Sequence, residues 1–282
     1  MLSYRHAFHA GNHADVLKHF IELQLLQYLN QKDKPYWMID THAGAGLYAL
    51  DQAYAAKNAE FVDGIGRLMA RTDLPAPLVE YVALVRGLNP DGGLKIYPGS
   101  PWLAMQILRQ QDQLRLFELH PTDSKLLHEH FAYAGRRVKI EAADGFAGLK
   151  ALLPPQPRRA LVLIDPPYEE KQDYQRVPAA LKDALQRFET GSYAVWYPLL
   201  QRHESQHFSA SLKRLPVNSW LNVNLTVHTP HADGFGMHGS GMFIINPPWT
   251  LLATLRIVMP YLTKVLGQDG GAGFNLETGN NR

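Results

Sequence analysis

The sequence contains no cysteine. Disulfide bonds and zinc or iron–sulfur sites with cysteine ligands are therefore excluded, and a cytoplasmic location fits. No run of about 18 apolar residues occurs, so we expect no membrane-spanning helix, and residues 1–15 lack the apolar core of a secretion signal. Positive and negative charges nearly cancel, at 28 Lys and Arg against 26 Asp and Glu. That balance permits a nucleic-acid partner but does not demand one.

The length and the alternation of segments indicate one large α/β domain. The 282 residues, 46% of them hydrophobic and 19% charged, can bury a sizeable core without cross-links. After Gly99, helical and strand-like segments alternate, which is typical of a doubly wound and mostly parallel sheet. We expect strands at residues 36–39, 114–119, 138–142, 160–164 and 193–197.

One early segment departs from this alternation. Residues 51–89 have helical patterning with little strand character, and they are long for a simple crossover. We interpret them as a small inserted helical subdomain. The main domain would then consist of residues 1–50 and 90–266.

The end of the chain also differs. Residues 220–229 and 241–246 are both strand-like, and only a loop joins them. A loop this short cannot form a parallel crossover, so these two strands should be antiparallel neighbours and one of them should be reversed in the sheet. Residues 267–282 are rich in Gly and Asn, which predicts a disordered tail.

The strongest chemical signal is an apolar strand that leads directly into Asp165-Pro166-Pro167-Tyr168. Ligands of open α/β sheets bind at the carboxyl ends of the strands, where this motif must lie. An adenine N6 amine becomes nucleophilic when acceptors hold its protons, and the Asp165 carboxylate and the Pro166 carbonyl can accept one proton each. The prolines fix that carbonyl, and Tyr168 offers a face on which a flipped base can stack. Asp-Pro-Pro alone is more often a rigid turn, but the preceding strand and the tyrosine favour the catalytic interpretation.

A glycine-rich turn and two further acids fit a nucleotide-like cofactor. Asp40 ends a buried strand and is followed by Gly44 and Gly46, which permit close backbone approach. Taken alone, this turn is weak evidence. Glu118 and Asp144 end the next two strands, where Glu118 could accept both hydroxyls of a ribose and Asp144 could accept from an adenine amine. Three successive strands that end in an acid at one sheet edge favour a cofactor site.

Two other motifs have plainer explanations. His203-Glu-Ser-Gln-His207 matches the zinc-protease pattern, but no third ligand is marked, so we interpret it as an exposed helix face and expect no metal. Asn246-Pro-Pro-Trp resembles a variant of the Asp165 motif. Its strand should be the reversed one, which would direct Asn246 away from the cofactor edge. We therefore interpret it as a strand-to-helix turn.

Together these motifs resemble the amino-methyltransferases of the class I S-adenosylmethionine-dependent fold. Over nearly the whole chain to about Leu266, the sequence resembles the RlmJ family, which methylates N6 of an adenine in 23S ribosomal RNA. The resemblance rests on the segments Tyr4-Arg-His6, Phe8-His-Ala-Gly-Asn-His-Ala-Asp-Val-Leu-Lys-His19, Asp40-Thr-His-Ala-Gly-Ala-Gly46, Tyr97-Pro-Gly-Ser-Pro101 and Asp165-Pro-Pro-Tyr168.

The resemblance implies S-adenosyl-L-methionine as cofactor and Asp165 as the proton acceptor. The residues that we assign to the cofactor, from the motifs and the resemblance together, are Lys18, His19, His42, Gly44, Gly46, Ser100, Glu118, Asp144, Gly145 and Asp165. Tyr4, Pro166 and Tyr168 would contact the substrate. We expect a monomer that acts on 23S ribosomal RNA free of ribosomal proteins and that does not bind a membrane.

Two other functions stay open at this point. The same motif could serve an enzyme acting on DNA adenine or on a protein glutamine, because both substrates offer a similar nitrogen. A third interpretation is a ribosome-binding assembly factor with an inactive site, although the intact acids argue against it. Methyl transfer to protein-free RNA, to DNA and to protein would separate all three.

Overall fold

The computed structural model describes residues 6–50 and 59–281. Its helices are η1 (His6–Phe8), α1 (His13–Asn30), α3 (Glu60–Asp63), α4 (Ile65–Met69), α5 (Ala76–Gly87), α6 (Ser100–Ile107), α7 (Pro121–His130), η2 (Gly135–Arg137), α8 (Gly145–Leu152), α9 (Asp173–Arg187), α10 (His203–Lys213) and α11 (Leu251–Leu266). Its strands are β1 (Trp37–Asp40), β2 (Leu47–Ala49), β3 (Ile96–Pro98), β4 (Gln113–Phe117), β5 (Val138–Glu141), β6 (Ala160–Ile164), β7 (Ser192–Leu199), β8 (Trp220–Thr226), β9 (Gly239–Ile245) and β10 (Gly273–Gly279).

The central sheet has eight strands in the order β10-β8-β9-β7-β6-β1-β4-β5. The strands from β5 to β7 run parallel to one another. β9 is antiparallel to both β7 and β8, and β10 is antiparallel to β8. The predicted doubly wound class I methyltransferase fold with an antiparallel terminal strand is therefore confirmed, as is the antiparallel pairing of β8 with β9. β2 and β3 form a separate antiparallel pair.

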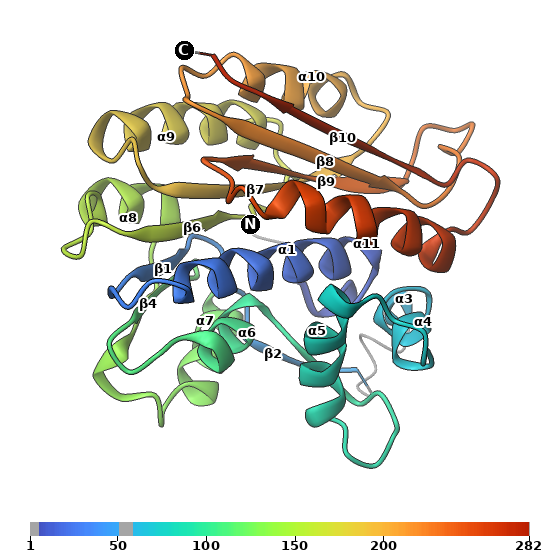
Figure 1. The fold of residues 1–282 in the computed structure, drawn as a ribbon, viewed down its shortest axis with the longest axis horizontal. Helices are drawn as coiled ribbons and strands as arrows, with labels where there is room; N and C mark the ends of the chain where they lie inside the picture. Colours follow the sequence, from blue (N-terminus) through green and yellow to red (C-terminus); the bar gives the residue numbers. More distant parts are fainter. Residues whose placement is uncertain (1–5, 51–58, 282) are drawn as a thin grey trace.

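Helices cover both faces of the sheet (Figure 1). α1, α5, α6 and α11 pack with the sheet in one apolar cluster, and α8, α9 and α10 pack against the opposite face. β6 shows why a continuous apolar strand is needed between two such layers. Leu161 and Leu163 join the α1 side, Val162 and Ile164 join the α9 side, and all four are buried. The strand that leads to Asp165 is thus held rigidly from both faces.

The described part of the predicted insert, from residue 59 onward, is helical. Ile65 of α4 and Val82 of α5 belong to the same apolar cluster as Phe20 of α1, and α5 also contacts α11. These helices therefore extend the α1-side layer and share its core. The division into a main domain and an inserted subdomain stays a prediction.

The predicted disorder of residues 267–282 is wrong for Gly273–Gly279, which form β10. β10 pairs with β8 along its whole length, from Gly273 opposite Thr226 to Gly279 opposite Trp220. The polar composition has a physical reason, since an edge strand that leaves much of its surface in water gains its stability from backbone hydrogen bonds rather than from a continuous apolar face.

Candidate active site

The carboxyl ends of the parallel strands meet at one edge of the sheet, where the predicted acids gather. Asp40 ends β1, Glu118 follows β4, Asp144 follows β5 and Asp165 follows β6. A cavity of about 290 Å³ opens at this edge, near the lower end of the usual size of a ligand site. It is lined by ten of the predicted site residues, namely Lys18, His19, His42, Gly44, Ser100, Glu118, Asp144, Gly145, Asp165 and Pro166.

The start of α1 brings charged side chains to this edge. Asn12 caps the helix, because its side chain accepts hydrogen bonds from the backbone N–H groups of Ala14 and Asp15. Spacing of three and four residues then places Asp15, Lys18 and His19 on one side of the helix. All three side chains are buried, which is rare for ionisable residues without partners.

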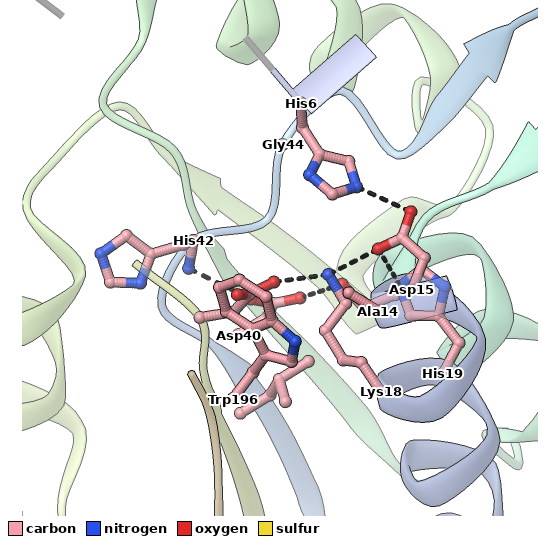
Figure 2. A network of polar contacts seen from close by, with 12 residues as sticks. His6, Ala14, Asp15, Lys18, His19, Asp40, His42, Gly44 and Trp196 are labelled. Carbon is pink, nitrogen blue, oxygen red and sulfur yellow. Dashed lines mark hydrogen bonds and ion pairs between the residues drawn. The ribbon is translucent and has the colours of Figure 1, made fainter. Parts of the chain in front are cut away.

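Lys18 lies between two carboxylates. Its Nζ atom donates to Oδ2 of Asp165 at 2.5 Å and lies 3.0 Å from Oδ1 of Asp15. Nε2 of His6 lies 2.9 Å from the other oxygen of Asp15, and Figure 2 shows these contacts as a continuous network. Burial by itself would lower the pKa of Lys18, but the two carboxylates hold it well above its usual range. The lysine is therefore charged and fixes the orientation of Asp165.

Lys18 lines the cavity as predicted. Its ammonium group, however, is bound by Asp15 and Asp165 and is not free to bind a cofactor carboxylate. Burial would raise the pKa of Asp15, yet the contact with His6 and the charge of Lys18 hold it well below its usual range. Sequence reasoning assigned no role to Asp15, although its spacing from Lys18 and His19 on a largely apolar helix was a usable signal.

Glu118 is held by the glycine-rich turn. Its Oε2 accepts from the N–H of Gly44 at 2.8 Å, and its Oε1 accepts from the N–H of His120 at 2.7 Å. Each oxygen keeps a lone pair that can accept a ribose hydroxyl. Gly44 adopts φ +60°, and a Cβ there would come within 2.1 Å of the Tyr48 hydroxyl, so only glycine fits beside the cavity.

Asp144 begins the next helix at the cavity wall. Its Oδ1 accepts from the N–H of Phe146 at 2.9 Å and caps α8, and its Oδ2 accepts from Arg176 at 2.6 Å.

The ring of His42 packs edge-on against Phe146, with centroids 5.1 Å apart. Burial lowers the pKa of His42 to about 3, so the imidazole is neutral. At Gly145 a Cβ would lie 2.1 Å from the Thr41 carbonyl oxygen. The wall therefore offers rings and an acid, which suit a flat heterocycle.

Two further predicted residues, Ser100 and Gly46, lie close to β1, and only Ser100 lines the cavity. Ser100 donates from Oγ to Oδ2 of Asp40 at 2.6 Å. Burial raises the pKa of Asp40 to about 6 against the opposing effect of that hydrogen bond. Gly46 is not among the residues that line the cavity. A Cβ on Gly46 would meet Phe131 at 2.8 Å, and its φ is +78°, so this glycine shapes the turn rather than the binding surface.

A second cavity also reaches Asp165. Its volume is about 610 Å³, and it shares His6, Lys18, Asp165, Pro167 and Glu169 with the first cavity. Among residues 6–50 and 59–281, neither Oδ1 of Asp165 nor the carbonyl of Pro166 has a hydrogen-bond partner. Two acceptors are thus available where the two cavities meet.

The predicted stacking role of Tyr168 is wrong for this structure. Its side chain is 1% exposed, and its ring packs against Tyr174, Trp196 and Phe208 with centroids 4.8–6.0 Å apart. The hydroxyl donates to the carbonyl oxygen of Trp196 at 2.8 Å. The ring therefore has no free face for a base. Tyr168, whose φ is +52°, therefore anchors the Asp165 motif in the core.

Tyr4, which was predicted to contact the substrate, lies outside the described residues. Its role stays a prediction.

The two competing motifs are structural. Nδ2 of Asn246 donates to the carbonyl oxygens of Glu189 and Gly191, both at 2.8 Å, and β9 directs this turn away from the cavity edge. The rings of His203 and His207 stack on each other at 4.1 Å. Within the described ranges, no group of three or more His, Cys, Asp or Glu residues could hold a metal ion.

None of the helices in residues 6–50 and 59–281 has both the length and the apolar character needed to span a membrane.

Comparison with known proteins identifies the family. The family model described as "Ribosomal RNA large subunit methyltransferase D, RlmJ" matches residues 33–277. Ribosomal RNA large subunit methyltransferase J of Escherichia coli (strain K12) is 47% identical over 270 residues, which are 96% of this chain and 96% of that protein. The protein of the same name from Haemophilus influenzae is 44% identical over 278 residues, 98% of each chain. A crystal structure of a protein from Legionella pneumophila superposes with a TM-score of 0.88 at 37% identity, covering 96% of this chain and 98% of that chain. The chain therefore belongs to the RlmJ family of ribosomal RNA large subunit methyltransferases.

Proposed function

We propose that this protein transfers a methyl group from S-adenosyl-L-methionine to the exocyclic N6 amine of an adenine in 23S ribosomal RNA. The observation that carries the proposal is the pair of available acceptors at Asp165 and Pro166, fixed by Lys18 at the junction of two cavities. Family membership supports ribosomal RNA as the substrate class, and the geometry of the acceptors supports an amine as the target.

The residues of the first cavity fit S-adenosyl-L-methionine, which when bound would supply an electrophilic methyl group. Glu118 would accept the ribose hydroxyls, because each of its oxygens has a lone pair beyond its backbone bond. Asp144 would accept from the adenine amine, with His42 beside the ring. At Gly44 and Gly145, which line the cavity, any side chain would collide with the Tyr48 hydroxyl or with the Thr41 carbonyl oxygen.

The chemistry at the amine follows from the orientation of Asp165. Lys18 binds Oδ2, which leaves Oδ1 to accept one N6 proton while the Pro166 carbonyl accepts the other. With S-adenosyl-L-methionine bound, both hydrogen bonds would direct the nitrogen lone pair at its methyl group. The methyl–sulfur bond would break as the N–C bond forms, S-adenosylhomocysteine would leave, and Asp165 would accept the proton that N6 releases. Lys18 stabilises the carboxylate before that step and holds its geometry throughout.

The second cavity has the better position for the flipped base and its flanking nucleotides. It also reaches Asp165, and its wall includes His228 and Arg202, which can meet phosphates. Of the basic residues near the insert, Arg67 is paired with Asp63 and Arg71 with Asp73. These two arginines are thus already engaged by carboxylates.

A substrate comparison tests the proposal. The purified protein would be incubated with labelled S-adenosyl-L-methionine and with protein-free 23S ribosomal RNA, adenine-containing DNA or a glutamine-containing protein. We expect transfer to the RNA alone, with N6-methyladenosine after digestion to nucleosides. Transfer to DNA or to protein at an equal or higher rate would refute the substrate, and a methyl group on another atom would refute the N6 assignment.

A further inference from the structure

A chain of buried hydroxyl and imidazole groups connects the predicted insert with the charged network at Asp165. The hydroxyl of Tyr81, on α5, lies 2.9 Å from that of Tyr97, on β3. The Tyr97 hydroxyl lies 2.7 Å from Nδ1 of His19, on α1. Nε2 of His19 lies 3.9 Å from Oδ1 of Asp15, the carboxylate that also holds Lys18. The three aromatic side chains are at most 1% exposed, so water does not compete for these contacts.

The direction of the chain follows from the groups at its inner end. Oδ1 of Asp15 lies 3.9 Å from Nε2 of His19, which is longer than a hydrogen bond, but the negative charge of the carboxylate favours the tautomer that carries the hydrogen on Nε2. Burial lowers the pKa of His19 well below its usual range, and the ring is therefore neutral. Nδ1 then has a free lone pair and accepts from the Tyr97 hydroxyl. The Tyr97 oxygen in turn accepts from Tyr81, so both O–H groups point toward the active site.

We propose that Tyr97, supported by Tyr81, is a positioning residue that fixes the tautomer of His19 and through it the Asp15–Lys18–Asp165 network. The proposal rests on the proposed function of that network. Without the Tyr97 hydroxyl, Nδ1 of His19 would be a buried acceptor with no donor. The proton could then move to Nδ1, and the bare Nε2 lone pair would face the Asp15 carboxylate. Repulsion there would displace Asp15 and loosen the hold of Lys18 on Asp165.

The two tyrosines should not have equal effects. Loss of the Tyr97 hydroxyl breaks the bond to His19 directly. Loss of the Tyr81 hydroxyl removes only the donor to the Tyr97 oxygen, and Tyr97 can still donate to His19. A Tyr81 substitution should therefore matter only while the Tyr97 hydroxyl is present. Because Tyr81 belongs to α5, this connection would make the insert a part of the catalytic framework.

Phenylalanine variants test this difference between Tyr97 and Tyr81 under single-turnover conditions with saturating cofactor. Tyr97→Phe should lower the methyl-transfer rate about fivefold to tenfold, the worth of one buried hydrogen bond, with RNA affinity unchanged. Tyr81→Phe should lower it about twofold, and adding Tyr81→Phe to Tyr97→Phe should cause no further loss. Tyr193→Phe is the matched control, because its buried hydroxyl bonds to backbone carbonyls outside the network, and its rate should equal that of the wild type.

Nitrogen-15 NMR of the His19 ring provides a readout that does not depend on activity. The wild type should show the Nε2–H tautomer, and Tyr97→Phe should lose it. A wild-type ring protonated at Nδ1, a Tyr97→Phe rate equal to that of Tyr193→Phe, or additive losses in the double variant would each overturn the proposal. If the wild type itself failed to methylate RNA, the proposed function would fail, and the NMR result would still decide the tautomer.

Discussion

Lys18 and Asp165 are 147 residues apart in the sequence, and their charged atoms lie 2.5 Å apart at the junction of two cavities. The ammonium group is shared with Asp15, so one buried cation balances the buried carboxylate of Asp15 and the partly buried carboxylate of Asp165. This arrangement orients the acceptor oxygen of Asp165 and offsets the cost of burying the charge of Asp15. It makes Lys18 a part of the catalytic centre as well as of the core.

Lys18→Met should lower methyl transfer by at least about 100-fold. Methionine keeps the length of the side chain but leaves Asp15 and Asp165 without their shared cation, and breaking a buried ion pair from one side costs about 3–5 kcal/mol. The melting temperature should fall as well. Lys95→Met, at an exposed lysine paired with Asp91, is the control and should change neither quantity. Transfer by a folded Lys18→Met protein at the wild-type rate would show that Asp165 does not need this partner.

Glu118→Ala should weaken the binding of S-adenosylhomocysteine by at least about tenfold while RNA affinity stays the same. A carboxylate that accepts two ribose hydroxyls makes charge-assisted hydrogen bonds, each worth about 1.5–3 kcal/mol. Isothermal titration calorimetry provides the measurement. Glu141→Ala is the matched control, because Glu141 ends the neighbouring strand β5 and is exposed. Equal affinities for the two variants would remove Glu118 from the cofactor site.

Asp40→Asn should change how stability depends on pH. Burial raises the pKa of Asp40 to about 6 from an ordinary 3.8, so the folded protein holds this proton more tightly than the unfolded chain. The resulting stability is complete below about pH 4 and is lost as the pH rises through 6. Asparagine has no proton to lose. Between pH 4 and pH 7, the difference in unfolding free energy should shift in favour of the variant by about 3 kcal/mol.

Urea unfolding at several pH values measures that shift. Asp91→Asn, at an exposed aspartate, should run parallel to the wild type across the same range. A constant difference between Asp40→Asn and the wild type would mean that folding does not raise the pKa of Asp40.

Tyr168→Phe should leave methyl transfer within a few-fold of the wild type. The ring fills a buried space between Tyr174 and Phe208, which phenylalanine also fills. Only the hydroxyl bond to the Trp196 carbonyl is lost, at a cost of about 0.5–1.5 kcal/mol of stability. Chemical unfolding and single-turnover kinetics on the same preparation separate the two effects. A large fall in rate without a fall in stability would restore a direct substrate role for this tyrosine.

The sequence was sufficient to predict the sheet and most of the candidate site, because the ends of the strands can be recognised in it. The acids and glycines at or shortly after the ends of β1, β4, β5 and β6 had to meet at one edge once the strands were parallel. The orientation of β9, inferred from a short loop, was enough to separate Asn246 from Asp165.

What could not be read from the sequence depended on side-chain packing. Tyr168 has the same position in the motif whether its ring faces a base or the core, and only the surrounding rings of Tyr174, Trp196 and Phe208 decide. The partners of Lys18 were missed because one of them is distant in sequence. β10 was missed because an edge strand needs backbone pairing more than an apolar pattern.

The most direct test of the account is the nucleoside product of Asp165→Asn. Asparagine keeps the shape of the side chain but cannot accept the proton from N6. Protein-free 23S ribosomal RNA would be incubated with the wild type or the variant and S-adenosyl-L-methionine, then digested and analysed by mass spectrometry. We predict N6-methyladenosine from the wild type and none from the variant, although the variant stays folded. N6-methyladenosine at the wild-type level from a folded Asp165→Asn protein would contradict the account.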